Sequence, residues 1–127
     1  MAAGGQSRVT ASGPGVTLGP NAAVTLNMAF HELATNAAKY GSLSHPEGQV
    51  DVAWSVDRSL EPATIAIDWR EAGGPSVLAP SRRGFGSRLL EQGITRELGG
   101  TVTLGFEPQG LHCSMRLPTS AKIHVSG

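Results

Sequence analysis

The chain of 127 residues has the length of a single domain with one hydrophobic core. Its 39% hydrophobic and 16% charged residues are typical of a globular protein and argue against intrinsic disorder. Ten basic residues balance ten acidic ones, so neither nucleic acid nor a membrane surface is an expected partner. The single cysteine, Cys113, excludes an intrachain disulfide, and no signal peptide or membrane-spanning run is visible. We therefore expect a cytoplasmic protein.

The first part of the chain predicts two short strands followed by a long helix. The strands are expected at Ser7 to Ala11 and Val16 to Leu18, on either side of the turn SGPG. Asn21 is a plausible N-cap, because its side chain can accept from free backbone amides at the start of a helix. That helix is predicted to run to about Tyr40, where the loop GSLSHPEG ends it.

Alternating patterns then predict two hairpins separated by a loop and a second helix. Apolar residues occupy every second position at 49–57 and 63–71, and again at 102–106 and 111–117. Between the hairpins, the loop from Gly73 to Gly84 leads into helical spacing from Gly86 to Leu98. This order predicts an α/β (α+β) two-layer sandwich of about residues 7–118, with helices covering one face of a mainly antiparallel, mixed sheet.

The stretch HELATNAAKYG in the long helix carries three polar groups that could act together. Glu32, Asn36 and Lys39 are three or four positions apart, so their side chains share one helix face. An apolar stripe lies opposite, with Leu26, Phe30, Leu33, Ala37 and Tyr40. A carboxylate, an amide and an ammonium could serve a metal-bound phosphate. The pattern also fits an ordinary amphipathic helix whose polar residues face water.

The second candidate segment is a loop rich in glycine. Gly73 and Gly74 open it and GFGS closes it, so backbone amides could approach a polyanion without interference from a Cβ atom. The adjacent Arg82 and Arg83 could add compensating charge. The segment matches neither the Walker A sequence nor the Rossmann glycine pattern, and flexibility alone would also explain its composition.

Together these segments resemble the catalytic domains of histidine kinases. HELATNAAKYG is similar to their N box, and WREAGGP followed by GFGSRLL is similar to their later glycine boxes. His31 combined with Trp69 and Glu71 matches the pattern that names the HWE histidine kinases. The resemblance extends from about Arg8 to Pro118 and implies the Bergerat ATP-binding fold.

This resemblance also implies roles for the residues of the long helix. Asn36 corresponds to the Mg²⁺ ligand, and its amide oxygen suits a hard cation. Glu32 corresponds to the acid that orients or deprotonates the attacking group, and Lys39 is placed to meet phosphate oxygens. Tyr40 is expected to pack beside the nucleotide. The loop from Pro75 to Arg83 corresponds to the ATP lid of these kinases. His31 could contact phosphate, support this lid by a hydrogen bond, or simply occupy the helix surface.

The glycine-rich half supplies the rest of the implied ATP site. Glu71 stands where most relatives have an Asp that accepts the adenine amino hydrogen. Gly73, with Gly74 beside it, would let the base lie close to the backbone, whereas Gly84 and Gly86 would flank the triphosphate near Arg83. Trp69 alternates with apolar neighbours, so a place in the core is favoured over nucleotide contact. Leu111 stands where many relatives have Thr, which puts one hydroxyl contact near the adenine in doubt.

The expected function is that of the Mg-ATP-binding catalytic domain of a bacterial two-component sensor kinase. Its partner would be the dimerisation and phosphoacceptor helices of the parent kinase and, indirectly, a response regulator. No such helical region precedes Ser7, so little autophosphorylation is expected of this chain alone. A regulatory module or serine kinase of the anti-sigma type is the alternative, and a degenerate domain with only a structural use is a third.

Overall fold

The computed structural model describes residues 8–39, 41–74, 92–108, 110–120 and 123–125. The elements, in chain order, are β1 Val9–Ser12, β2 Val16–Leu18, α1 Pro20–Lys39, the 3₁₀ turn η2 Ser42–Ser44, β3 Gln49–Asp57, β4 Thr64–Ala72, the π-helical segment η3 Gln92–Glu97, β5 Thr101–Glu107, β6 Gly110–Pro118 and β7 Ile123–Val125.

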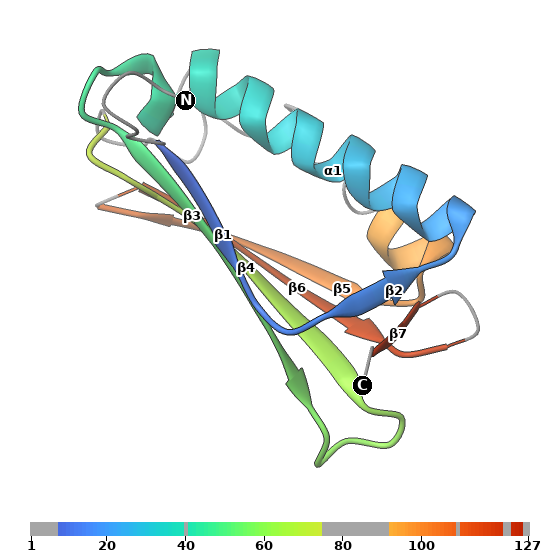
Figure 1. Cartoon of the computed structure of the whole chain (residues 1–127). Helices are drawn as coiled ribbons and strands as arrows, with labels where there is room; N and C mark the ends of the chain where they lie inside the picture. The colour runs from blue at the N-terminus through green and yellow to red at the C-terminus, as the bar shows by residue number, and fades with distance from the viewer. Residues whose placement is uncertain (1–7, 40, 75–91, 109, 121–122, 126–127) are drawn as a thin grey trace.

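Two layers make up the molecule, as the sequence predicts. A five-stranded sheet has the order β1-β3-β4-β6-β5, in which β1 runs parallel to β3 and the other neighbours are antiparallel. Helix α1 lies along one face of this sheet, and η3 packs against α1 on the same side (Figure 1). The prediction of a mixed, mainly antiparallel sheet covered on one face by helices is therefore confirmed.

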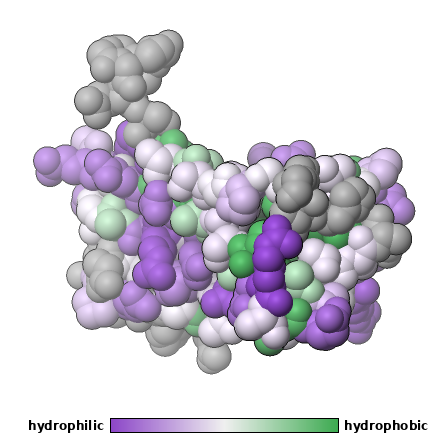
Figure 2. Space-filling view, turned by 60° about the horizontal axis from the view of Figure 1, so that its bottom comes forward, coloured by the Kyte–Doolittle hydropathy of each residue, from purple (hydrophilic) through white to green (hydrophobic). Residues whose placement is uncertain are grey.

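The alternating pattern of the strands determines which side chains form the core. Every second residue of β3, β4 and β6 points toward α1, and the inward set is buried with the apolar stripe of the helix. Polar residues such as Asp51, Arg70 and Ser114 occupy the alternate positions, which face away from α1. In Figure 2, which is turned to bring this side forward, the surface is mostly hydrophilic or intermediate in colour, with small hydrophobic patches.

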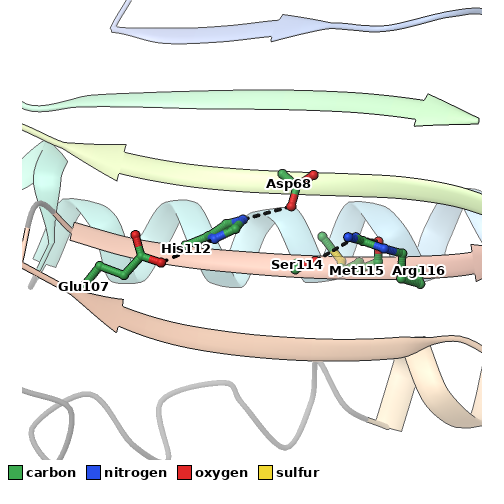
Figure 3. A network of polar contacts seen from close by, with 6 residues as sticks. All are labelled: Asp68, Glu107, His112, Ser114, Met115 and Arg116. Carbon is green, nitrogen blue, oxygen red and sulfur yellow. Dashed lines mark hydrogen bonds and ion pairs between the residues drawn. The ribbon is translucent and has the colours of Figure 1, made fainter.

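A polar cluster on that outer face links three neighbouring strands. His112 on β6 lies 2.9 Å from Asp68 on β4 through Nε2, and 3.7 Å from Glu107 on β5 through Nδ1 (Figure 3). Nearby, the Arg116 guanidinium donates to the Ser114 hydroxyl at 2.7 Å. The half-buried His112 thus has a structural role, which is the one its position in a strand suggests.

The start of the long helix differs from the prediction. The helix begins at Pro20 rather than after an Asn21 cap, and the amide of Ala23 donates to the carbonyl of Gly19. Proline suits the first helical position, because its fixed φ is helical and its missing N–H would have no partner there. The preceding Gly19 is then the cap, and the interpretation of Asn21 as the N-cap is wrong.

Strand pairing near the two ends of the chain also departs from what local patterns suggest. The two short strands around SGPG do not pair with each other: β1 joins β3, whereas β2 pairs with β7. Strand β7, which includes His124, lies beyond residues 7–118, the range predicted for the sandwich. Three residues carry too little alternation to predict a strand, and its partner is over a hundred residues away.

Within the described residues, no helix is long and apolar enough to cross a membrane.

Candidate functional site

Glu32, Asn36 and Lys39 lie on α1 as predicted, but they do not share one exposed face. Asn36 is only 8% exposed and continues the buried stripe of Leu33 and Ala37. Glu32 is half-buried at the edge of that stripe, and Lys39 is exposed in the last turn. The spacing from Ala29 through Leu33 to Asn36 explains this result, because steps of four and three residues stay in line on a helix. The amide therefore lies against the sheet, and the two charged groups lie nearer the solvent.

His31 is exposed on the surface of α1. This position is compatible with the simplest of its three proposed roles, which is occupancy of the helix surface. The residues that a lid would contribute, at 75–91, lie outside the described part of the chain, so the other roles remain predictions.

Glu71 is a buried carboxylate with two well-defined donors. The side chain is 2% exposed at the end of β4, on the face that α1 covers. The indole Nε1 of Trp69 donates to Oε2 at 3.0 Å, and the backbone amide of Ser42 donates to Oε1 at 3.1 Å. Because each carboxylate oxygen receives a hydrogen bond from a different segment, the plane of the carboxylate is fixed.

The hydrogen bond from Trp69 is a feature that sequence reasoning missed. Trp69 is 3% exposed and stacks on Phe30 of α1, with ring centroids 6.4 Å apart, so its predicted place in the core is correct. Two residues apart on one strand, Trp69 and Glu71 point to the same side of the sheet. That spacing was the available signal, since a buried indole N–H needs an acceptor. The Trp and Glu of the HWE pattern therefore act as one hydrogen-bonded unit.

The segment after α1 folds back onto the end of β4. Residues 41–48 form the η2 turn and a following loop, held by hydrogen bonds from Ser44 N to Gly41 O and from Gly48 N to His45 O, both 3.1 Å. A Cβ atom on Gly74 would lie 2.3 Å from Ser42 Cα, which no real structure tolerates. Backbone therefore lies directly against backbone where the two halves of the predicted site meet.

Gly73 brings the same segments together by its conformation. Its φ of +77° is in the left-handed region that favours glycine, and a Cβ there would lie 2.6 Å from Glu47 O. In this structure the absence of side chains at Gly73 and Gly74 thus accommodates residues 41–48.

Ser42 contributes a second polar group beside Glu71. The residue is 3% exposed, and its Oγ is buried with no hydrogen-bond partner among the described residues. Buried polar atoms are almost always hydrogen-bonded, and an unsatisfied hydroxyl costs about 1–3 kcal/mol. An orphan hydroxyl next to a buried carboxylate is the kind of arrangement that a polar ligand would complete.

Several predicted site residues lie outside the described residues. These are Tyr40, Arg83, Gly84 and Gly86, so their proposed contacts with a nucleotide remain predictions. Among the residues that are described, the structure brings together the end of α1, the η2 turn and the end of β4. Glu71 and Ser42 are joined by the hydrogen bond from the Ser42 amide, and Asn36 lies one to two turns before that junction.

A separate apolar cavity lies away from this junction. Its volume is about 620 Å³, and it is lined by side chains of α1, β1, β3 and β4 together with the turn at Gly13 to Gly15. Trp69 is its link to the site, and none of the predicted catalytic or ATP-binding residues in the described part of the chain lines it. The polar groups of the candidate site therefore lie outside this cavity.

Cys113 shows how dry the neighbouring core is. The thiol is fully buried on β6, directly opposite Trp69. Burial raises its pKa to about 12, with smaller contributions from the charges of Asp68 and Glu71. The thiol stays protonated at physiological pH and behaves as a small apolar side chain.

The fold is that of histidine kinase catalytic domains. The histidine kinase domain of the blue-light-activated kinase EL346 from Erythrobacter litoralis superposes with a TM-score of 0.69 at 18% identity, covering 87% of this chain and 51% of that one. The solution structure of the kinase domain of the E. coli osmosensor EnvZ matches with a TM-score of 0.54 at 19% identity, covering 99% and 84%. At such identities the likeness establishes the fold alone.

Sequence similarity then identifies a narrower group. A blue-light-activated histidine kinase of Brucella anthropi is 39% identical over 116 residues, which are 91% of this chain and 24% of that protein. The corresponding protein of Brucella ovis is 35% identical over 117 residues. No family model matches. The chain is thus homologous to a segment of the blue-light-activated histidine kinases, consistent with the HWE pattern, and it spans about a quarter of their length.

Proposed function

We propose that this chain is the ATP-binding catalytic domain of a histidine kinase, transferring the γ-phosphate of ATP to a histidine on a separate dimerisation domain. The observation that carries the proposal is the buried Glu71 carboxylate, fixed by Trp69 and by the Ser42 amide at the junction of two distant segments. An ionised carboxylate only accepts hydrogen bonds, so it complements the amino group of adenine. It disfavours guanine, because guanine has a carbonyl oxygen, which is also an acceptor, at the corresponding position.

The residues of α1 supply the phosphate side of the proposed site. Asn36 would hold Mg²⁺, which neutralises phosphate charge when bound, because an amide oxygen suits this hard cation. Glu32, half-buried one turn earlier, is placed to orient or deprotonate the attacking imidazole, and the exposed Lys39 can reach phosphate oxygens. Phosphoryl transfer asks a protein mainly for positioning and charge neutralisation, and these groups provide both.

The polar groups around Glu71 and the histidine kinase fold both support this function. A rigid acceptor and an orphan hydroxyl meet at one place, which supports the recognition of a purine there. The relatives named as histidine kinases are much longer than this chain, in agreement with an acceptor histidine on another part of the parent protein. Contributions from Tyr40, Gly74, Arg83, Gly84 and Gly86 to nucleotide binding belong to the same proposal.

Phosphate transfer to an acceptor supplied separately tests this function. The purified chain is mixed with an independently expressed dimerisation-helix segment of a histidine kinase and with ATP labelled at the γ-phosphate. We expect acid-labile label on the acceptor, which Glu32→Gln strongly reduces. Acid-stable label on serine would favour a regulatory kinase of the anti-sigma type. The absence of any nucleotide-dependent thermal shift would contradict both functions.

A further inference from the structure

The hydroxyl of Ser42 has no role in the fold that the described residues reveal. The backbone amide of Ser42 donates to Glu71, but the side-chain oxygen is buried with no hydrogen-bond partner in the described part of the chain. Two residues further on, Ser44 differs: its hydroxyl donates to the carbonyl of Gly41 at 2.6 Å, and the residue is exposed. The same short turn therefore holds one serine that stabilises the turn and one that does not.

The surroundings of Ser42 hold the residue in place and offer the hydroxyl little alternative. A Cβ on Gly48 would lie 1.5 Å from Ser42 O, and one on Gly74 would lie 2.3 Å from Ser42 Cα, so glycine backbone presses on the residue from both sides. The amide bond to Glu71 fixes it from a third direction. The backbone of Ser42 is therefore preorganised, and a ligand that meets the hydroxyl would lose little entropy in ordering this residue.

We propose that Ser42 Oγ donates a hydrogen bond to a ring nitrogen of bound adenine, beside the amino group that Glu71 accepts. This inference rests on the proposed function. Along the edge of adenine, the amino group is flanked by N1 and N7, which are both acceptors. A carboxylate that receives the amino hydrogen therefore needs a donor as its neighbour, and a serine hydroxyl is such a donor.

The composition of the opposite strand strengthens this assignment. Leu111 of β6 is 3% exposed and carries no polar group, so it cannot supply a hydroxyl beside Glu71. Next to it, Gly110 lies directly on β4, where a Cβ would come within 2.2 Å of Glu71 O. Ser42 thus supplies a hydroxyl from the α1 side of the Glu71 carboxylate, whereas Leu111 on the β6 side supplies none.

Calorimetric titration of ATP into the chain and into Ser42→Ala tests the inference, with Ser44→Ala as the matched control. We expect Ser42→Ala to weaken ATP binding about 3- to 10-fold, the range for one neutral hydrogen bond, and Ser44→Ala to change it less than 2-fold. One of the two analogues 1-deaza-ATP and 7-deaza-ATP lacks the ring nitrogen that accepts this hydrogen bond. With that analogue in place of ATP, Ser42→Ala and the wild-type chain should bind equally well.

A second measurement separates ligand binding from a structural role. Without nucleotide, Ser42→Ala should keep or raise the thermal unfolding midpoint, since it removes an unsatisfied buried hydroxyl, whereas Ser44→Ala should lower it. If Ser42→Ala fails to fold, Ser42→Cys keeps the size and weakens the donor, and the same loss of affinity is expected.

The outcomes distinguish this inference from the function on which it rests. Wild-type binding of ATP with an unchanged dissociation constant in Ser42→Ala would overturn the role of Ser42 and leave the proposed function standing. A lowered midpoint of nucleotide-free Ser42→Ala, or a loss that persists against both deaza analogues, would also overturn that role. Failure of the wild-type chain to bind ATP at all would overturn both.

Discussion

Replacing Trp69 by Phe tests the unit formed by the Trp and Glu of the WxE pattern. The change removes the indole N–H that donates to Glu71 Oε2 at 3.0 Å, while an aromatic ring still packs against Phe30. A hydrogen bond to a charged acceptor contributes about 1.5–3 kcal/mol. The smaller ring gives up roughly 40 Å² of buried apolar surface, which adds about 1 kcal/mol. The expected loss of unfolding free energy is about 2.5–4 kcal/mol.

Trp54 offers a matched control in the same sheet. Its indole also donates to an oxygen, the carbonyl of Pro14 at 2.7 Å, but this acceptor is neutral and the bond is exposed. We expect Trp54→Phe to lower the unfolding free energy by about 1–2 kcal/mol and to leave nucleotide binding unchanged, since Trp54 lies far along β3 from the Glu71 junction.

Urea unfolding followed by circular dichroism measures both variants. Trp54→Phe has the further use that Trp69 becomes the only tryptophan, so its fluorescence reports the environment of Glu71 directly. We expect ATP to change this fluorescence, and Trp69→Phe to bind ATP about 3- to 10-fold more weakly, because the carboxylate is no longer held on one side. Equal destabilisation by the two substitutions, with ATP affinity intact in both, would refute the reasoning.

Other predictions concern the glycine contacts and the buried thiol. Gly48→Ala should destabilise the chain by at least about 2–3 kcal/mol in urea unfolding, because its Cβ would lie 1.5 Å from Ser42 O, whereas Gly99→Ala should cost only about 1 kcal/mol for its φ of +67°, with nothing within 4 Å. Equal effects would contradict the close packing of residues 42 and 48. The thiol of Cys113 loses its proton from about pH 9 in the unfolded chain, but keeps it to about pH 12 in the folded chain. Between these pH values the unfolding free energy should therefore fall by up to about 1.4 kcal/mol per pH unit. Cys113→Ala should lack this part of the slope in unfolding curves measured from pH 8 to 11, and an identical slope would show that the thiol does not titrate as described.

Local patterns predicted much of the fold, because most strands here have one buried face. The alternation at Gln49–Asp57 specified β3 without error, and β4 is displaced by one residue from its predicted range. Where pairing depends on contacts distant in sequence, the patterns failed. The parallel pairing of β1 with β3 and the existence of β7 follow from the assembled sheet, and a strand of three residues has no period of its own to detect.

The candidate site was partly visible in the sequence, and what was missed has a physical cause. Helical spacing indicated Asn36 together with Glu32 and Lys39, whereas Glu71 was predicted only from the resemblance to histidine kinases. Their burial was less accessible: Asn36 lies on the apolar stripe, so the predicted division into one polar and one apolar face was too simple. Ser42 carried no signal at all, since its burial arises from glycine backbone that packs around it in three dimensions.

The central claim is that one nucleotide lies with its base at Glu71 and its phosphates at Asn36. Calorimetric titration of ATP and GTP, with and without Mg²⁺, tests it in Asn36→Ala and Glu71→Gln, with folding of each variant checked by circular dichroism. The account predicts that Asn36→Ala loses the Mg²⁺ dependence but still prefers ATP, and that Glu71→Gln loses the preference for ATP but retains the Mg²⁺ dependence. Folded variants that both bind ATP with wild-type selectivity and wild-type Mg²⁺ dependence would contradict it.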